Sequence, residues 1–380
     1  MTARFDDALD GTALVFPQPV RVLTARRAAD VAPLLDEVDR ATRDGAWAFG
    51  FLAYEAAAGL DPGCAVAAPG TTEPLAWFGI SPAPAVEALV ARCASREYWC
   101  SRWQLDATAE QHRRGVRHAQ HEIAAGNIYQ ANLTSRTRAT VRGELAGLYA
   151  DLVHAQQASF NAFLDLGDAT VLSASPELLF EWSPPMLRCR PMKGTARRGM
   201  TRADDDAAAS RLSASTKDIA ENVMIVDLVR NDLGRIARTG SVRVTRLCVG
   251  EPFGSVWQLS SDVEAEPRAD VGLGDVFSAL FPSGSITGAP KRAAMSVIRE
   301  LEPDPRGAYC GAIGWVAPPG HPTRARFNVA IRTVVVDRRT GTAVYGAGGG
   351  ITAASDPDSE FQELLDKTAV LSTTQDDDEL

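Results

Sequence analysis

The alternation of apolar and polar residues divides the chain into two parts. Before residue 100, short strand-like runs at 46–54 and 75–80 are separated by connections rich in Ala and Pro. Further on, residues 110–125 have the period of a helix closed by a Gly-Asn pair, and residues 128–141 alternate as a strand does. Hairpins and helices then alternate without an internal repeat. The pattern predicts a mixed chain of strands and helices.

Composition narrows the class of protein. The chain has 380 residues, of which 45% are hydrophobic, enough for one large domain or two modest ones. The formal net charge of -9 and the scattered arginines argue against a nucleic-acid-binding surface. The first ten residues hold three aspartates and no apolar run, and no stretch approaches the length of a membrane span. We therefore expect a cytoplasmic globular protein that binds neither nucleic acid nor membrane.

A predicted hairpin brings a glutamate and a lysine together. Residues 178–182 and 187–192 are both strand-like, and the Ser-Pro-Pro sequence between them is a turn signal. If the hairpin is centred near Pro185, residues whose numbers sum to 370 face each other, as Glu177 and Lys193 would. An arbitrary pair of this kind is more often a surface ion pair of little energetic value. Here each residue lies where a strand meets a turn, which suits a functional site.

Two pairs of carboxylates are each spaced three residues apart on a predicted helix. A Ser-Thr-Lys-Asp run opens one helix with a capping-box pattern, and Asp218 and Glu221 share a face of it. An Asp-Pro pair opens a second helix, on which Glu360 and Glu363 share a face. Acids at helix N-termini also complement the helix dipole, which explains either pair alone. Two such pairs without a His/Cys pattern favour a hard cation such as Mg²⁺ held by oxygen ligands.

Two glycine-rich segments are candidates for receiving an anion. Residues 284–291 run into a helix predicted at 292–301, where backbone N–H groups and hydroxyls could bind a carboxylate. Residues 346–350 form a predicted loop before the second carboxylate helix, and its glycines would let a ligand approach the backbone. Neither segment has the spacing of a nucleotide-binding loop. Arg332, after a strand predicted at 327–331, is either a carboxylate ligand or a surface arginine.

Several stretches between residues 110 and 370 resemble the chorismate-utilising enzymes, which include anthranilate, aminodeoxychorismate, isochorismate and salicylate synthases. The resemblance implies an α/β (α+β) fold in which two antiparallel sheets pack together, with helices outside and the active site between the sheets. In the order that the family has, the similarity is carried by residues 126–134, 173–180, 191–195, 221–234, 284–291, 306–314, 331–333 and 348–367.

The resemblance also suggests a division of the chain. Residues 1–100 would form a shortened N-terminal region of the same sandwich, and residues 101–370 the chorismate-binding catalytic domain. Residues 371–380 are expected to be a disordered acidic tail.

The same resemblance implies a role for each candidate residue. Glu221 and Glu363 would ligate Mg²⁺, with Asp218 and Glu360 in its outer shell, although Asp218 stands where the family is expected to have a glutamate. The C1 carboxylate of chorismate would bridge the metal and the glycine loop. The residues implied in substrate binding are Gly194, Thr195, Ser285, Tyr309, Arg332, Gly348, Gly349 and Gly350.

Lys193 distinguishes branches of the family. Anthranilate synthases have alanine at this position. The lysine of this chain resembles the lysine of the aminodeoxychorismate synthases. A lysine near Mg²⁺ in a dry cleft should have a lowered pKa, so that its neutral amine could attack C2 of chorismate while Glu177 protonates the departing 4-hydroxyl. Ammonia would then replace Lys193 and give 4-amino-4-deoxychorismate for p-aminobenzoate and folate, or for an antibiotic precursor.

Alternatives within and outside this reaction remain. The water-using relatives have a general-base lysine where Ala131 is aligned, and anthranilate synthases have a histidine where Gln258 is aligned, so both chemistries are disfavoured. No cysteine has the context of a glutaminase nucleophile, and a separate glutamine amidotransferase subunit is expected to supply ammonia. The alternatives are an anthranilate synthase component and a catalytically silent chorismate-binding protein.

Overall fold

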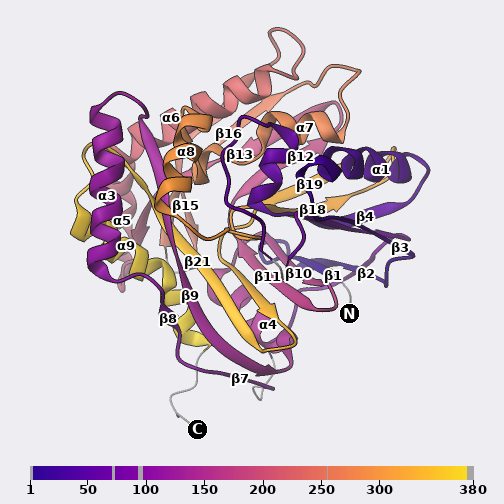
Figure 1. Cartoon of the computed structure of the whole chain (residues 1–380), viewed down its shortest axis with the longest axis horizontal. Coiled ribbons are helices and arrows are strands. Elements are labelled where there is room, and N and C mark those ends of the chain that lie inside the picture. Colours follow the sequence, from indigo (N-terminus) through magenta and orange to yellow (C-terminus); the bar gives the residue numbers. More distant parts are fainter. Residues whose placement is uncertain (1–2, 71–72, 93–96, 255, 375–380) are drawn as a thin grey trace.

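Two antiparallel sheets organise the chain in a computed structural model that describes residues 3–70, 73–92, 97–254 and 256–374 (Figure 1). Helices lie outside the sheets, and the expected fold class is confirmed. The first, 11-stranded sheet has the order β17 (Gly288–Ala289), β9 (Gln130–Gly143), β21 (Thr342–Ile351), β20 (Thr333–Asp337), β11 (Ala169–Ser175), β10 (Phe160–Asp165), β1 (Ala3–Asp7), β2 (Thr12–Phe16) and β6 (Ala85–Ala88), with β7 (Tyr98–Cys100) and β8 (Gln104–Leu105) also on β9.

The second, 10-stranded sheet contains the hairpin expected around Pro185. Its order is β14 (Met192–Arg197), β16 (Val256–Ala265), β13 (Met186–Arg190), β12 (Leu178–Ser183), β19 (Ala325–Val329), β18 (Ala312–Val316), β4 (Trp47–Leu52), β5 (Ala76–Ser81) and β3 (Arg21–Ala25), with β15 (Arg243–Phe253) also on β16.

The helices connect and cover these sheets. The α-helices are α1 (Val31–Arg43), α2 (Ala57–Leu60), α3 (Ala109–Ala124), α4 (Leu145–Gln156), α5 (Arg202–Ser213), α6 (Thr216–Gly234), α7 (Leu273–Leu280), α8 (Lys291–Leu301) and α9 (Pro357–Thr368), and the 3₁₀ helices are η1 (Ala28–Asp30), η2 (Tyr54–Ala56), η3 (Gly284–Ile286) and η4 (Ala369–Thr373). None of the helices in the described ranges is long and apolar enough to cross a membrane.

Local sequence signals explain where α3 and α9 begin. The Thr108 hydroxyl accepts a hydrogen bond from the Gln111 backbone N–H, and the Gln111 side-chain oxygen accepts one from the Thr108 N–H, so α3 starts at Ala109. At the start of α9, the Asp356 carboxylate accepts a hydrogen bond from the Ser359 backbone N–H, and Pro357 occupies the first helical position. The capped start of α9 orients its first turn, which carries Glu360.

Three apolar clusters form the layers of the core. Aromatic and aliphatic residues of both sheets meet between them, among them Phe16 and Leu164 from the first sheet and Phe49 and Trp315 from the second. A second cluster joins the outer face of the second sheet to α1, α6 and α7. The third joins the outer face of the first sheet to α4 and α9. The two carboxylate helices, α6 and α9, therefore cover different sheets.

The N-terminal residues are divided between the sheets. β1 pairs with β10 in the first sheet, and β4 pairs with β18 in the second. At the other end of the chain, residues 371–373 belong to η4, and the part of the expected tail from residue 375 onward lies outside the described residues.

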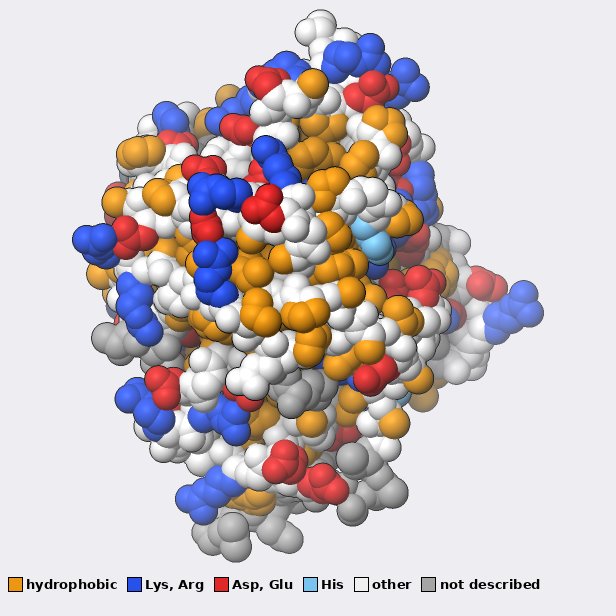
Figure 2. Space-filling view, turned by 90° about the vertical axis from the view of Figure 1, so that its right-hand side faces the viewer, with side chains coloured by type: hydrophobic (Ala, Val, Ile, Leu, Met, Phe, Trp, Pro, Cys, Tyr) orange, Lys and Arg blue, Asp and Glu red, His pale blue; other side chains and the backbone are white. Residues whose placement is uncertain are grey.

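Figure 2 shows the face on the right-hand side of Figure 1, where the edge strand β3 lies. Hydrophobic side chains gather in the middle of this face, while acidic and basic side chains are scattered around it. At β3, Val20 and Val22 leave large apolar side chains exposed.

Candidate active site

A bulge in β14 sets the position of Lys193. Lys193 pairs with Leu259 of β16 and Thr195 pairs with Gln258, which leaves Gly194 as an extra residue in the ladder. Gly194 has φ +84°, the left-handed conformation that glycine adopts without steric cost. The Lys193 ammonium points to the first sheet, because a Cβ on Gly350 of β21 would lie 3.2 Å from its Nζ. Lys193 thus spans the space between the two sheets.

The predicted register between Glu177 and Lys193 is wrong. In the hairpin, Trp182 pairs with Leu187 and Leu178 with Arg190, and a bulge lies between these pairs. The strand then breaks at Pro191, which has no N–H to donate, and Lys193 belongs to the next strand, β14. The two residues are not cross-strand neighbours, but the Lys193 ammonium still lies close enough to lower the pKa of Glu177.

Glu177 is a buried carboxyl with a raised pKa. Only 3% of the residue is exposed, and the Ser285 hydroxyl donates a hydrogen bond of 2.5 Å to its Oε1. Burial raises the pKa of Glu177 to about 7, against the opposing effects of the Ser285 hydrogen bond and the Lys193 charge. A carboxyl that is partly protonated at neutral pH can donate a proton to a leaving group.

The pKa of Lys193 is shifted in the complementary direction. Loss of hydration lowers it, and the ammonium of Lys367 lowers it further, while Glu221, Glu177 and Glu363 oppose both effects. A lowered pKa increases the fraction of neutral amine, which is the nucleophilic form. The site therefore holds a candidate proton donor and a candidate nucleophile side by side.

The four predicted carboxylates meet at the mouth of this site. A Cβ on Gly349 would lie 3.1 Å from Glu360 Oε2 and 3.6 Å from Glu363 Oε1, and a Cβ on Gly194 would lie 2.9 Å from the Cβ of Asp218. Glu221 belongs to the same group, since its pKa is influenced by both Asp218 and Glu360. The structure thus brings α6 and α9 together across β14 and β21.

Two lysines compensate the carboxylates. The Lys217 ammonium lies 4.0 Å from Glu221 Oε1 and 3.9 Å from Glu360 Oε1. Lys367 Nζ lies 2.6 Å from Glu363 Oε1 and donates to the Gly348 carbonyl, also at 2.6 Å. Within the described residues, no three His, Cys, Asp or Glu side chains are already arranged to hold a metal ion.

One carboxylate oxygen nevertheless accepts no hydrogen bond. Glu221 Oε1 is buried and accepts no hydrogen bond, which is unusual for a charged oxygen. Because a hard cation prefers carboxylate oxygens, the four carboxylates have the chemistry of a Mg²⁺ site. The Lys217 ammonium supplies part of the positive charge there.

The predicted glycine loop is part of a strand. Residues 346–350 pair with β9 throughout, with Gly348 opposite Thr134 and Gly350 opposite Asn132. The glycines are needed because other groups approach this strand closely: a Cβ on Gly346 would lie 2.2 Å from the Tyr309 ring. The segment is therefore a rigid wall of the site.

The remaining residues predicted to bind substrate differ in whether the protein already engages their polar groups. Arg332 follows β19 with φ +52°, and its guanidinium donates to the Lys367 carbonyl and, at 3.4 Å, to the Tyr345 hydroxyl. The Ser285 hydroxyl is engaged by Glu177, whereas Thr195 is exposed on β14. Tyr309 is buried against Gly346.

Gln130 is a site residue that the sequence analysis missed. It is fully buried, and neither its Nε2 nor its Oε1 has a hydrogen-bond partner. A Cβ on Gly350 would lie 2.2 Å from Gln130 Nε2 and 3.2 Å from Lys193 Nζ, so the amide lies beside the lysine. Ala131, which we had aligned with a catalytic base, packs instead in an apolar cluster with α8. Residues 130–133 are all buried, so alternation along β9 gives no signal for residue 130.

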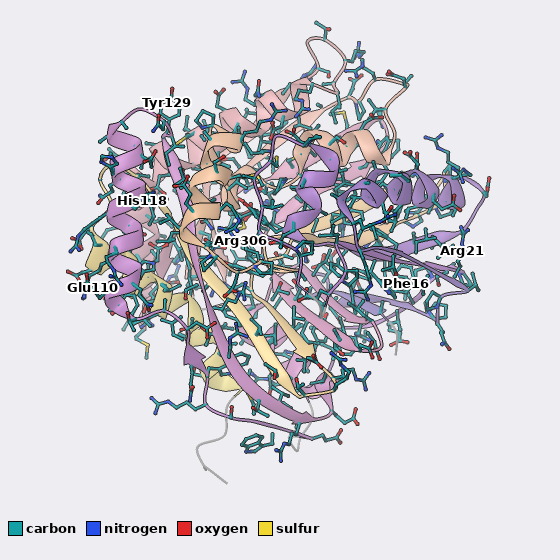
Figure 3. The ribbon with its side chains drawn as sticks, viewed as in Figure 1. Phe16, Arg21, Glu110, His118, Tyr129 and Arg306 are labelled. Atoms are coloured by element: carbon teal, nitrogen blue, oxygen red, sulfur yellow. The ribbon has the colours of Figure 1, made fainter. Side chains whose placement is uncertain are left out.

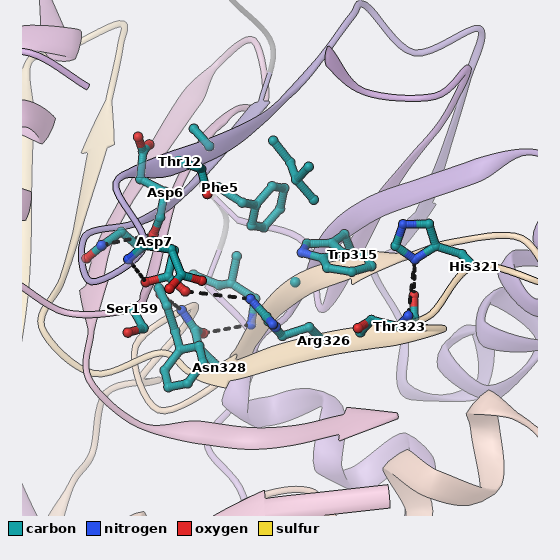
Figure 4. A pocket seen from close by; sticks show the side chains of 17 residues that line it. Phe5, Asp6, Asp7, Thr12, Ser159, Trp315, His321, Thr323, Arg326 and Asn328 are labelled. Atoms are coloured by element: carbon teal, nitrogen blue, oxygen red, sulfur yellow. Dashed lines mark hydrogen bonds and ion pairs between the residues drawn. The ribbon is translucent and has the colours of Figure 1, made fainter. Parts of the chain in front are cut away.

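A separate cavity lies between the sheets (Figure 4). The cavity has a volume of about 220 Å³. The described residues that line it include none of the site residues predicted from the sequence. Arg326 enters it between the Trp315 ring and Asp7, at 6.0 Å from the ring centroid and 3.9 Å from the Asp7 carboxylate.

Comparisons with known proteins identify the family to which the chain belongs. A family model described as chorismate binding enzyme matches residues 85–373. Aminodeoxychorismate synthase component 1 of Escherichia coli (strain K12) is 42% identical over 267 residues, covering 70% of this chain and 58% of that protein. Anthranilate synthase component 1 of Aquifex aeolicus (strain VF5) is 36% identical over 269 residues, covering 71% of this chain and 53% of the relative. The chain thus matches between about half and three-fifths of these relatives' lengths.

A solved structure supports the fold. Anthranilate synthase component I from Streptococcus pneumoniae TIGR4 has a TM-score of 0.82 and 24% sequence identity, and the match covers 96% of this chain and 92% of the other.

Proposed function

Because the chain belongs to the family of chorismate binding enzymes, we propose that it aminates chorismate to 4-amino-4-deoxychorismate, as an aminodeoxychorismate synthase component. The observation that carries this proposal is the opposed pKa shifts of Glu177 and Lys193 in one site. Such a pair suits a reaction that needs an acid and a neutral amine at the same pH.

In the proposed reaction, the neutral Lys193 amine attacks C2 of chorismate. The two conjugated ring double bonds shift, and the C4–O bond breaks as Glu177 donates its proton to the leaving hydroxyl, which departs as water. Ammonia then attacks C4, both double bonds shift back, and the C2–N bond breaks with Lys193 leaving as the neutral amine. The proton that the new C4 ammonium loses returns to Glu177. The sum is chorismate and ammonia giving 4-amino-4-deoxychorismate and water, with the enolpyruvyl group retained.

The walls of the site supply candidates for substrate binding. Gly348, Gly349 and Gly350 have no side chains, so the carboxylate of the substrate could approach their backbone closely. The unpartnered Gln130 amide is suited to hydrogen-bond the substrate or ammonia. Further contacts are proposed for Gly194, Thr195, Ser285, Tyr309 and Arg332.

Mg²⁺ is the proposed cofactor. Glu221 and Glu363 would hold it, with Asp218 and Glu360 in the outer shell. When bound, the cation would neutralise the C1 carboxylate of the substrate. The buried Glu221 oxygen that accepts no hydrogen bond supports this assignment.

A second subunit is the proposed source of ammonia. The name component 1, which the Escherichia coli relative has, belongs to a protein with a further component. We propose that a glutamine amidotransferase releases ammonia to this chain, and that residues 101–370 form the unit that uses it.

Product analysis tests the proposal against the nearest alternative, an anthranilate synthase component. The chain is incubated with chorismate, Mg²⁺ and ammonium, and the products are separated by chromatography with detection of pyruvate and of anthranilate fluorescence. We expect 4-amino-4-deoxychorismate without stoichiometric pyruvate. Anthranilate formed with equal pyruvate would overturn the proposal. No turnover and no binding of chorismate would point to loss of function.

Lys193→Ala tests the covalent step. The variant should lose amination by at least a thousandfold while it still binds chorismate in a calorimetric titration. Lys217→Ala is the matched control, since it also removes an ammonium near Glu221 but leaves the proposed nucleophile in place. Equal amination rates in wild type and Lys193→Ala would remove the covalent role.

A further inference from the structure

Arg306 connects two walls of the site without reaching the space between them. Its side chain is almost fully buried, and Figure 3 places it near the centre of the molecule, beside β9 and β21. Nη1 donates to the Ile286 carbonyl and Nη2 to the Asn132 carbonyl, each at 2.8 Å. Ile286 follows Ser285 in η3, and Asn132 is two residues from Gln130 in β9. One planar group therefore ties the turn that holds Glu177 to the strand that faces Lys193.

Glu302 completes this link. The Arg306 Nε donates to Glu302 Oε2 and Nη2 to Glu302 Oε1, each at 2.8 Å. Oε1 also accepts the backbone N–H of Thr134 at 2.8 Å, so β9 is held at a second point. The Tyr54 ring lies 4.6 Å from the guanidinium carbon and covers it. This arrangement fixes the plane of the guanidinium as well as its charge.

Two carboxylates from the N-terminal region hold the backbone of Arg306. Glu55 accepts the N–H of Arg306 at 2.6 Å and that of Gly307 at 3.0 Å. Glu73 accepts the N–H of Ala308 at 2.7 Å. Three consecutive N–H groups are thus satisfied by buried carboxylates, which fixes the point from which the Arg306 side chain projects.

We propose that Arg306 is a positioning residue that sets the distance between Ser285 and Gln130, and through them the placement of Glu177 relative to Lys193. It touches neither substrate nor cofactor. A lysine could neutralise Glu302, but its compact ammonium cannot span two carbonyls and a carboxylate in one plane. This inference rests on the proposed amination, although its test includes a measurement that needs no turnover.

The experiment compares Arg306→Lys with a matched control, Arg324→Lys. Arg324 is also buried and binds a carboxylate, Asp39, and a backbone carbonyl, Ala317, but none of its recorded contacts is a site residue. Steady-state rates with chorismate and ammonium are measured on folded protein. Arg306→Lys should lower kcat at least tenfold with KM for chorismate changed less than threefold. Arg324→Lys should lower the thermal unfolding midpoint but keep kcat within twofold.

A second readout follows the Glu177 carboxyl directly. Its ¹³C NMR titration, assigned by comparison with Glu177→Gln, gives its pKa without substrate. Displacement of Ser285 in Arg306→Lys should raise this pKa, whereas Arg324→Lys should leave it unchanged. If the wild-type chain fails to aminate chorismate, the proposed function fails, and the titration alone decides the role of Arg306.

Several outcomes would overturn the inference. If Arg306→Lys keeps the wild-type kcat and the wild-type pKa of Glu177, the positive charge alone suffices. If both lysine variants lose the same amount of kcat, the effect is a general one on folding. If Arg306→Lys does not fold, Glu55→Gln takes its place, because it loosens the backbone and leaves the guanidinium intact. It should lower kcat by three- to tenfold and raise the Glu177 pKa. Wild-type values for both would overturn the inference.

Discussion

The Ser285 hydroxyl donates a 2.5 Å hydrogen bond to the Glu177 carboxylate, and both groups are buried. This bond favours the ionised form of Glu177, whereas burial favours the protonated form. The turn at Ser285 therefore adjusts how readily Glu177 can give up its proton.

Ser285→Ala should raise the pKa of Glu177 above its wild-type value of about 7. Because Glu177 acts in its protonated form, the alkaline limb of the kcat profile should move to higher pH by about one unit, the value of a hydrogen bond to a charged group. Rates between pH 5 and 10 measure the shift. Ser283→Ala is the control, since its hydroxyl contacts Ser285 but not Glu177. An unchanged limb would exclude Glu177 as the titrating acid.

Glu177→Gln should change the pH dependence of stability. The folded-state pKa of Glu177, about 7, lies above the value of an unfolded glutamic acid, so the native protein holds this proton more tightly. The resulting stability is complete below about pH 4, and it declines as pH rises to 7. The variant should lack this decline, worth on the order of 3 kcal/mol. Urea unfolding at pH 4, 6 and 8 measures it, and parallel curves for both proteins would contradict it.

Gly194→Ala should destabilise the fold and impair catalysis. A Cβ there would require φ +84° in an L-residue and would lie 2.9 Å from the Cβ of Asp218. We expect a loss of about 2–4 kcal/mol in the free energy of unfolding. Gly167→Ala separates the two causes, because Gly167 has φ +90° but no neighbour within 4 Å. Equal losses in both variants would show that Asp218 is not in contact.

Gln130→Leu should separate stability from activity. The buried amide has no partner, so an apolar side chain of similar size should leave the unfolding midpoint equal or higher. Turnover should nevertheless fall at least tenfold, because a polar contact to the reactants is lost. Calorimetry and steady-state rates are compared on the same preparation. A stability loss with normal turnover would assign Gln130 a purely structural role.

Lys217→Met should increase the effect of Mg²⁺ on stability. Lys217 lies between Glu221 and Glu360, and without it these carboxylates repel each other. The metal-free variant should unfold at a lower temperature than wild type, and added Mg²⁺ should raise its midpoint by more. Arg202→Met, which removes an exposed partner of Asp206, is the control. An identical Mg²⁺ response in all three proteins would argue against the proposed cation site.

Elements with strong local signals could be predicted from the sequence. The α3 helix follows from its helical period and the Gly-Asn pair that closes it, β9 from a regular alternation, and α9 from an Asp-Pro start. The spacing of three residues also predicted correctly that the two carboxylates of α6 share a face of that helix, and likewise those of α9, because three residues make nearly one turn.

Relations between distant segments could not be predicted in the same way. The break at Pro191 and the bulge at Gly194 move Lys193 to a different ladder, and a hairpin centre cannot reveal either. Residues 346–350 are rich in glycine, which suggested a loop, whereas pairing with β9 makes them a strand. Gln130 was overlooked because the lack of hydrogen-bond partners for its amide becomes visible only when the neighbouring residues are placed around it.

The division of the N-terminal strands between both sheets bears on the order of folding. β4 pairs with the nearby β5 on one side, but its partner on the other side, β18, comes more than 250 residues later in synthesis. The α9 helix brings Glu360 and Glu363, so Lys193 and Glu177 emerge from the ribosome well before half of the carboxylates that surround them. Pairing over such separations slows folding. The chain thus has its complete site only when nearly all of it has been synthesised, and a product truncated before α9 would contain the acid and the amine without the proposed cation site.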